Sequence, residues 1–237
     1  MIPFMDADLN ALLAATLLFV GGHFLLSGDP LRSRLVEILG ETLFRGFYSL
    51  VMLAAFAAML VSYGEAPKTP LWSPPPVFNL VPLLVMPVAV VLLVSALTTP
   101  NPTMVGGEKV LDGRPESVAV GILTVTRHPF LWATTLWSAS HLFVRGDAAS
   151  VILMVGILAL SLGGMAHIDK RREAALGSDW GPVALTTSRL PFQAILQGRC
   201  KLDLAGIGWA RALGGLALYA VLLPAHGWIL GVPLLPV

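Results

Sequence analysis

Long apolar stretches constrain the fold of this chain more than any other feature of its sequence. A helix needs roughly 20 residues, at about 1.5 Å each, to cross a hydrocarbon core about 30 Å thick. Five stretches meet or approach that length: Leu9 to Leu26, Leu43 to Tyr63, Val77 to Thr99, Phe130 to Val144 and Ala148 to Ala166. A sixth, from about Leu204 to Leu235, contains Pro224. The sequence therefore predicts an all-α integral membrane protein, a bundle of six transmembrane helices.

The composition supports this fold class and narrows the partners. Of 237 residues, 56% are hydrophobic and 12% are charged, whereas about 25% of a typical soluble domain is charged. The net charge of +1 gives no reason to expect nucleic acid as a partner. The single cysteine, Cys200, excludes an internal disulfide. We expect residues 1–237 to form one transmembrane domain whose surroundings are the lipid bilayer.

A short helix is expected between the first two spans. Asp29 suits a helix cap and Pro30 suits a first helical turn. The amphipathic residues Leu31 to Leu39 follow, and Gly40 comes directly after them. This pattern predicts a short interfacial helix after the first span that ends at Gly40.

Prolines affect two further spans. Pro82 and Pro87 lack the backbone N–H that a helix interior uses, so we expect a kink in the third span that neighbouring helices support. The fourth apolar stretch is short unless the run from Ser117 to Thr126 continues it through Pro129.

Lysine and arginine are distributed unevenly between the connecting segments. With six spans, the segments around Asp29, Glu108 and Lys170 carry three, three and seven basic residues. The opposite side carries only Lys68 and Arg145. Because cytoplasmic loops are enriched in Lys and Arg, this asymmetry predicts that both termini lie on the periplasmic side of a bacterial inner membrane.

Two histidines lie inside the predicted spans, His23 and His141. A polar ring in hydrocarbon is costly, so each is a candidate functional group. Thr134, Ser138 and His141 follow one another at i, i+4 and i+7, which gives one helical face two hydroxyls and an imidazole. A neutral imidazole is a good iron ligand, and a neighbouring hydroxyl can fix its tautomer. The alternative is that each histidine only hydrogen-bonds another helix.

Polar groups also gather at the expected cytoplasmic ends of the fourth and fifth spans. Arg127 and His128 precede a proline that suits a helix start, and Arg127 suits the binding of phosphate or carboxylate. Anchoring by positive charge explains Arg127 equally well. The segment His167 to Glu173 reads mainly as a solvated charge run, from which Asp169 or Glu173 is placed to face Arg127.

Several short motifs, taken in order, resemble the NnrU family of bacterial membrane proteins. They are His23, Leu31-Arg32, Leu39 to Glu41, Phe44 to Leu50, Leu71-Trp72, Arg127 to Pro129, Ser140 to Leu142, Thr187 to Phe192, Ala194-Ile195 and Gly198-Arg199. Together they extend the resemblance over nearly the whole chain. It implies a role associated with denitrification and nitric oxide metabolism.

The NnrU family is in turn similar to zeta-carotene isomerase, a haem b membrane enzyme of plants and cyanobacteria. That similarity implies a haem b held by two axial histidines, which correspond to His23 and His141, and a haem-dependent cis–trans isomerisation of a lipophilic polyene. Ser138, Arg127 and His128 are the further candidate residues for binding the cofactor.

Counting residues along straight spans leaves other histidine pairs open. At about 1.5 Å per residue, His23 lies roughly 5 Å inside the cytoplasmic boundary and His141 roughly 16 Å inside it. Two ligands of one iron should lie at similar depth unless the haem plane is tilted. The pairs matched in depth are His23 with His128, and His141 with His226.

The half of the chain from Arg127 onward also resembles isoprenylcysteine and phospholipid methyltransferases. In those enzymes an Arg-His-Pro motif and a later acidic residue bind S-adenosylmethionine, and the matching residues here are Arg127, His128 and Glu173. The glycine that usually follows their motif is missing from residues 130–133.

Three functions are therefore open. The first is a haem-binding inner-membrane protein that acts on a lipophilic polyene or on nitric oxide. The second is a methyltransferase at the cytoplasmic face that uses Arg127, His128 and Glu173. The third is a non-enzymatic assembly or signalling factor, whose surface for a membrane-protein partner is the basic loop from Asp169 to Arg211.

Overall fold

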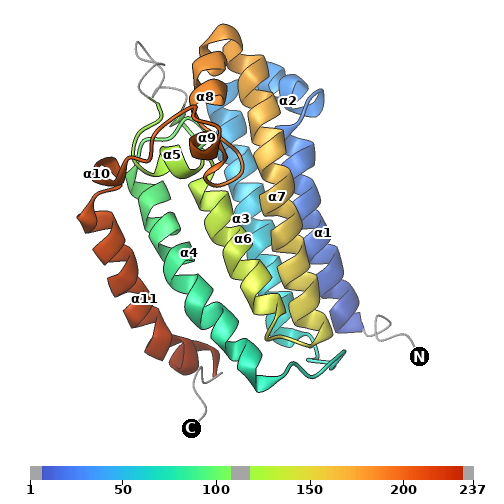
Figure 1. Cartoon of the computed structure of the whole chain (residues 1–237). Coiled ribbons are helices and arrows are strands. Elements are labelled where there is room, and N and C mark those ends of the chain that lie inside the picture. The colour runs from blue at the N-terminus through green and yellow to red at the C-terminus, as the bar shows by residue number, and fades with distance from the viewer. Residues whose placement is uncertain (1–6, 108–117, 232–237) are drawn as a thin grey trace. The chain divides into compact units, whose positions relative to one another are not determined.

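The computed structural model describes residues 7–107 and 118–231, and every regular element within them is helical (Figure 1). The α-helices are α1 (Ala7–Ser27), α2 (Leu31–Leu39), α3 (Glu41–Glu65), α4 (Leu80–Thr98), α5 (Ile122–Val125), α6 (Pro129–Leu142), α7 (Ala148–Leu176), α8 (Trp180–Thr186), α9 (Gln193–Leu196), α10 (Leu204–Ile207) and α11 (Trp209–Leu230). Two 3-10 turns, η2 (Pro76–Asn79) and η5 (Gly177–Asp179), precede α4 and α8. The all-α prediction is confirmed for these residues.

Length and composition identify the helices that can cross a membrane. In the described part of the chain, five helical segments qualify: Ala7–Ser27, Glu41–Glu65, Pro76–Thr98, Ala148–Thr186 and Trp209–Ile229. The remaining expected span is α6, but its 14 residues extend only about 21 Å, less than a hydrocarbon core of about 30 Å. The structure supports a polytopic membrane protein, whereas the count of six spans is not confirmed.

The fourth apolar stretch is not lengthened by the residues that precede Pro129. α5 ends at Val125, and Thr126 is extended, with φ −158° and ψ 145°. His128 precedes Pro129, and the residue before a proline is disfavoured in the helical region. The backbone N–H of Arg127 bonds the carbonyl of Ser188 (3.0 Å) instead of continuing a helix. α6 therefore begins at Pro129, because the backbone N–H of the first helical residue has no partner within the helix and proline lacks that N–H.

The short helix after the first span is confirmed as α2. Gly40 follows it with φ 76°, a conformation that glycine adopts without strain. The expected cap by Asp29 is wrong, because its carboxylate accepts a hydrogen bond from the Ser33 hydroxyl and the helix has no side-chain cap.

The chain divides into two compact units. Unit 1 comprises Met1–Phe78 and Ser138–His167, and unit 2 comprises Asn79–Trp137 and Ile168–Val237. α6 and α7 each run through both units.

In unit 1, small residues on α7 let it lie against α1. A Cβ atom at Gly156 would stand 2.3 Å from Thr16 Cγ2, and one at Gly163 would stand 2.9 Å from Phe24 Cζ. One turn further on, the Ser27 hydroxyl lies 2.9 Å from the ring of His167. Contact positions increase together along both helices, so α1 and α7 are parallel.

In unit 2, α4 and α11 pack together around Pro87. This proline lies inside α4 and has no N–H for the carbonyl four residues earlier, which belongs to Leu83. The Tyr219 hydroxyl of α11 donates a hydrogen bond to that carbonyl (2.9 Å). A Cβ at Gly215 would lie 2.7 Å from Val91 Cα, so this glycine permits the close approach. The expected support of the third span by a neighbouring helix is confirmed.

A small apolar core holds the connecting segments of unit 2. Leu92 of α4, Ile122 and Leu123 of α5, and Trp180 and Val183 of α8 are all buried in one cluster. This core fixes the residues between α5 and α6, which carry the Arg-His-Pro motif, against the segment after α8.

Candidate functional site

His23 lies on α1 in an aromatic environment of unit 1. Its ring meets Phe19 edge to face, with centroids 4.6 Å apart, and meets Tyr48 of α3 in the same way at 5.9 Å. Phe19 also packs on Phe56 of α3 (5.4 Å). The buried side chain of Met52 lies against Gly22, where a Cβ would stand 2.7 Å from Met52 Cε. Aromatic and thioether side chains therefore border the imidazole.

The tautomer of His23 follows from its hydrogen bond. Nδ1 lies 2.7 Å from the carbonyl oxygen of Phe19, one turn earlier on the same helix. A carbonyl can only accept, so the proton is on Nδ1 and the lone pair is on Nε2. Histidines that bind metals are oriented in this way, with one ring nitrogen donating to a carbonyl and the other left for the metal. His23 thus has the form of a metal ligand.

The direction of His23 follows from its neighbours on α1. Phe19, His23 and Ser27 are spaced by four residues, so each of the three is rotated by about 40° around the helix axis from the one before it. Phe19 packs on α3, and Ser27 bonds His167 of α7. His23 therefore lies on the part of α1 between its contacts with α3 and its contacts with α7.

His141 lies at the other end of unit 1. The backbone N–H of Arg145 bonds the carbonyl of His141 (3.0 Å). The Arg145 side chain reaches the hydroxyl of Ser150 (3.3 Å), which also lies 3.0 Å from the hydroxyl of Tyr63. His141 is thereby tied to the start of α7 and to the end of α3.

The register of α3 gives the separation of the two histidines along the helix axes. His23 is level with Tyr48, whereas His141 is near the level of Tyr63. Fifteen residues separate the two tyrosines, or roughly 22 Å of helix. Ligand nitrogens on one iron are only about 4 Å apart, given metal–nitrogen bonds of about 2 Å. This geometry does not fit His23 and His141 on the same iron.

The predicted hydroxyl face of α6 exists as a continuous helical face. α6 runs unbroken through Thr134, Ser138 and His141, and Ser138 is fully buried. The Ser140 hydroxyl lies 3.4 Å from Nδ1 of His141. The Thr134 hydroxyl donates to the carbonyl of Leu131 (3.0 Å) within its own helix.

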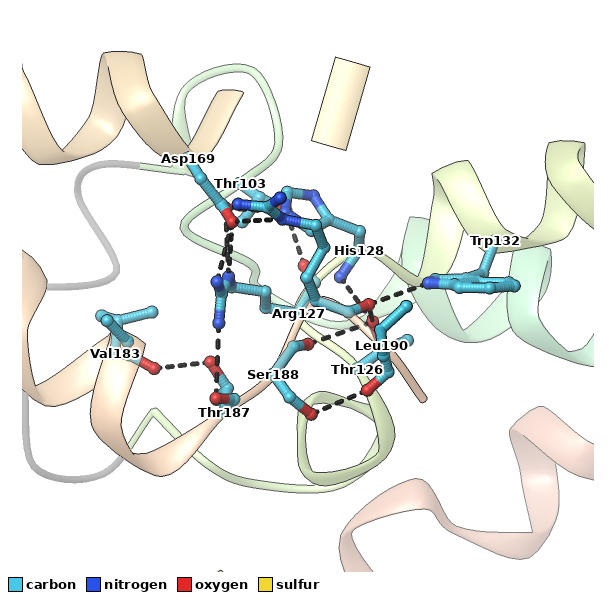
Figure 2. Close-up of polar contacts among 12 residues, drawn as sticks. Thr103, Thr126, Arg127, His128, Trp132, Asp169, Val183, Thr187, Ser188 and Leu190 are labelled. Atoms are coloured by element: carbon cyan, nitrogen blue, oxygen red, sulfur yellow. Dashed lines mark hydrogen bonds and ion pairs between the residues drawn. The ribbon is translucent and has the colours of Figure 1, made fainter. Parts of the chain in front are cut away.

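Arg127 and His128 converge on Asp169 in unit 2, as Figure 2 shows. The Arg127 guanidinium donates from Nε to Oδ1 (3.0 Å) and from Nη2 to Oδ2 (2.7 Å). The ring of His128 lies 2.7 Å from Oδ1 through Nε2. Arg189 adds a bond from its Nε to Oδ2 (3.1 Å). Of the two acidic residues expected opposite Arg127, Asp169 or Glu173, Asp169 is the one that faces it.

Hydrogen bonds from side chains to backbone carbonyls hold the Arg-His-Pro turn in position. The carbonyl of Arg127 accepts from Thr103 Oγ1 (2.7 Å) and from Asn101 Nδ2 (3.2 Å). The Thr126 hydroxyl donates to the carbonyl of Arg189 (2.9 Å). The Arg-His-Pro turn is thus joined to the loop before α5 and to the segment after α8 (Figure 2).

The cluster of Arg127, His128 and Asp169 is buried, and this burial determines the protonation state of His128. Relative exposure is 9% for Arg127, 2% for His128 and 5% for Asp169. Burial lowers the pKa of His128, and the hydrogen bond to Asp169 offsets this only in part. The neutral ring therefore donates from Nε2 to an ionised Asp169. Its Nδ1 is buried and has no hydrogen-bond partner among the described residues.

Glu173 does not join this cluster. It is exposed on the last turns of α7, and no bond from it to Arg127 or His128 occurs in the described part of the chain. Arg127 and His128 direct their donors to Asp169 and to the carbonyl of Thr187. In this structure the motif joins segments of unit 2 and presents no free cofactor-binding face with Glu173.

Several residues at these sites were not predicted from the sequence. His167 contacts Ser27 and the ring of Phe24 (5.6 Å), so it belongs to unit 1 packing and not to a solvated charge run. Arg189 joins the carboxylate of Asp169. The sequence signal available for Arg189 was its place in the Thr187 to Phe192 motif. No group of three or more His, Cys, Asp or Glu side chains within the described ranges could hold a metal ion.

Comparison with known proteins adds a family and two relatives. A family model described as NnrU protein matches residues 11–234. A chloroplastic 15-cis-zeta-carotene isomerase of Zea mays is 33% identical over 82 residues, which are 35% of this chain and 22% of that protein. The protein of the same name from Arabidopsis thaliana is 32% identical over 79 residues, which are 33% of this chain and 22% of that protein. Each match thus covers about a fifth of the isomerase. No solved structure matches.

Proposed function

The chain belongs to the NnrU family, and from this premise we propose that it is a membrane protein that binds haem b through His23. The observation that carries the proposal is the hydrogen bond from Nδ1 of His23 to the Phe19 carbonyl (2.7 Å), which leaves Nε2 as a lone-pair donor. Neutral imidazole is the commonest protein ligand of haem iron. The aromatic side chains around His23 suit a flat apolar macrocycle.

His141 is not assigned to the same iron. The roughly 22 Å between the levels of Tyr48 and Tyr63 exceeds what two imidazoles on one iron can span. His128 is not taken as the partner of His23, because its ring is buried in the cluster at Asp169, to which its Nε2 is bonded (2.7 Å).

The proposed ligand of the protein is a lipophilic polyene. The two relatives are named 15-cis-zeta-carotene isomerase, and the five apolar helical segments are consistent with a protein that lies in the bilayer, where a polyene dissolves. Bound haem would supply an iron centre able to coordinate an unsaturated or diatomic ligand. Nitric oxide is the second candidate ligand, and a role in denitrification would follow from it.

The proposed location is a bacterial inner membrane with both termini in the periplasm. Two of the three basic segments, around Asp29 and Lys170, are described, whereas part of the third, around Glu108, lies outside the described residues. Alkaline phosphatase fused after Val237 should be active, and a fluorescent protein there should be dark. An active phosphatase fused instead within residues 199–203 would contradict this orientation.

The methyltransferase function is not favoured by the cluster at Asp169. The guanidinium of Arg127 and the ring of His128 are buried and hydrogen-bonded within the protein. A partner protein that binds the basic loop from Asp169 to Arg211 is compatible with haem binding.

Spectra of detergent-purified variants test the assignment of His23. We expect His23→Ala to lose haem or to shift its Soret band, and added imidazole to restore the wild-type spectrum, because imidazole can replace the missing ligand. His141→Ala and His226→Ala are matched histidine controls and should keep the wild-type spectrum. A His23→Ala protein with an unchanged spectrum would overturn the proposal.

A further inference from the structure

A pocket of about 390 Å³ opens in unit 2, beside the cluster at Asp169. Three arginines line it, Arg127, Arg189 and Arg199, together with the amide side chain of Gln193. We call it the arginine pocket. Nothing in the proposed function uses it.

Shared acceptors hold the three guanidinium groups close together. Arg127 and Arg189 both bond Oδ2 of Asp169, at 2.7 and 3.1 Å. Arg127 and Arg199 both bond the carbonyl oxygen of Thr187, at 3.3 and 2.8 Å. Arg199 is held further by the carbonyls of Ala184 (3.2 Å) and Leu185.

The positive charge of the pocket is only partly balanced. Among the described residues, Asp169 is the only carboxylate bonded to any of the three arginines. Like charges this close repel one another, and a negative charge beside them offsets the repulsion. Counted over the described residues, one bonded carboxylate against three guanidiniums leaves an excess of two positive charges at the pocket.

Donors remain available in the pocket. The bonds of Arg189 use its Nε, and those of Arg199 use its Nε and Nη1. Within the described part of the chain, no hydrogen-bond acceptor is bonded to the Nη atoms of Arg189, to Nη2 of Arg199 or to the amide of Gln193. Planar guanidinium donors match the oxygens of a phosphate group in paired hydrogen bonds.

The surroundings of the pocket are apolar and exposed. Leu185, Leu190 and Leu196 are 66%, 53% and 84% exposed, and Phe192 is 48% exposed. The pocket lies at the charged end of α7, beyond the apolar run that ends at Ala166, where a bilayer boundary is expected. Basic pockets at this level suit the headgroups of anionic lipids.

We propose that the arginine pocket binds the phosphate group of an anionic membrane lipid. The guanidiniums of Arg189 and Arg199 and the amide of Gln193 hold the phosphate oxygens. The exposed leucines beside the pocket contact the acyl chains. The bound phosphate supplies the negative charge that Asp169 alone does not provide.

Lipid binding to the full chain in a neutral detergent tests this site. Phosphatidylglycerol should raise the thermal midpoint of the wild-type protein, and phosphatidylcholine should not. Arg189→Gln and Arg199→Gln should each weaken the apparent affinity for phosphatidylglycerol about tenfold, the loss expected for one charge-assisted hydrogen bond. Arg189→Lys should recover part of it. Lys201→Gln removes the same charge two residues from Arg199, outside the lining of the pocket, and should change the affinity less than twofold.

Two outcomes would overturn the assignment, and one control protects it. If inorganic phosphate stabilises the wild type as much as phosphatidylglycerol does, the ligand is a soluble anion and not a lipid. If Lys201→Gln weakens binding as much as Arg189→Gln does, the effect is general surface charge and not the pocket. Each variant is compared only if it elutes as a single species on size exclusion. The haem spectrum should be the same in all of these variants, so failure here leaves the proposal for His23 untouched.

Discussion

Replacing Asp169 by asparagine tests whether the Arg-His-Pro motif holds unit 2 together. The change keeps the volume of the side chain and removes the charge that Arg127 and His128 converge on. The side chains of Arg127 and Asp169 are 11% and 7% exposed, so the remaining guanidinium stays buried without a counter-charge. Breaking a buried ion pair from one side costs about 3–5 kcal/mol.

Thermal unfolding in detergent, followed by tryptophan fluorescence, measures this cost. At about 2–4 °C per kcal/mol for a chain of this size, Asp169→Asn should lower the midpoint by about 6–20 °C. The matched control is Glu41→Gln, which removes a carboxylate bonded to Arg32 and Arg45 at the surface, with 39% exposure of Glu41. Exposed pairs contribute about 0–1 kcal/mol, so this control should stay within a few degrees of the wild type.

A double variant separates loss of charge pairing from loss of packing. Arg127→Met with Asp169→Leu removes both charges and fills the space with apolar atoms, and it should be more stable than Asp169→Asn. Equal midpoints for Asp169→Asn and Glu41→Gln would refute the account of this cluster. A double variant less stable than the single one would show that other contacts carry the effect.

Three further predictions concern packing, hydrogen bonding and pH dependence elsewhere. Gly156→Ala should destabilise unit 1 by about 1–3 kcal/mol in thermal unfolding, because its Cβ would stand 2.3 Å from Thr16 Cγ2. The control is Gly21→Ala, whose Cβ would have nothing within 4 Å and which should be neutral or stabilising. Tyr219→Phe should cost about 1 kcal/mol by removing the donor to the Leu83 carbonyl, and the cost should shrink when Pro87→Ala restores the helical donor. The backbone N–H groups of Gly121 and Gly206 lower the pKa of Asp203. Their contribution to the stability of the fold is present above the unfolded pKa of about 3.9 and is lost as pH falls through the lower folded pKa. The difference in thermal midpoint between wild type and Asp203→Asn should therefore vanish below that range, and a difference that stays constant with pH would contradict the assignment.

The helices could be predicted from the sequence because bilayer length sets a simple requirement. The apolar stretches that contain His23 and Tyr63 appear as α1 and α3 with ends within a few residues of those expected. Other ends differ more: α7 continues to Leu176, ten residues past the expected Ala166, and α11 begins at Trp209. The 14 residues of α6 are too few to span, and only residues 122–125 of the preceding apolar run are helical, as α5. Local turn chemistry was less predictable, as the missing cap at Asp29 shows.

The candidate sites were predicted only where the partners lie on a helix with a clear direction or just before one. An acidic residue, Asp169 or Glu173, could be expected opposite Arg127 because these residues lie at the same expected end of neighbouring spans, but the sequence did not decide between the two. Arg189 and Arg199 could not be placed, since neither lies in a regular helix. The segment of Arg189 is placed by hydrogen bonds with residues about 60 positions earlier, and Arg199 is placed by its bonds to the carbonyls of Leu185 and Thr187. The level of His141 depends on the contacts of Arg145 and Ser150, which spacing alone does not reveal.

The haem content of the wild-type protein tests the central claim most directly. The protein is purified in mild detergent from cells supplied with a haem precursor, and haem b is measured as its pyridine complex against protein concentration. We predict one haem b per chain, with a Soret band that shifts on reduction with dithionite. Protein that contains no haem, and whose added haemin gives the same spectrum with wild type and His23→Ala, would contradict the account.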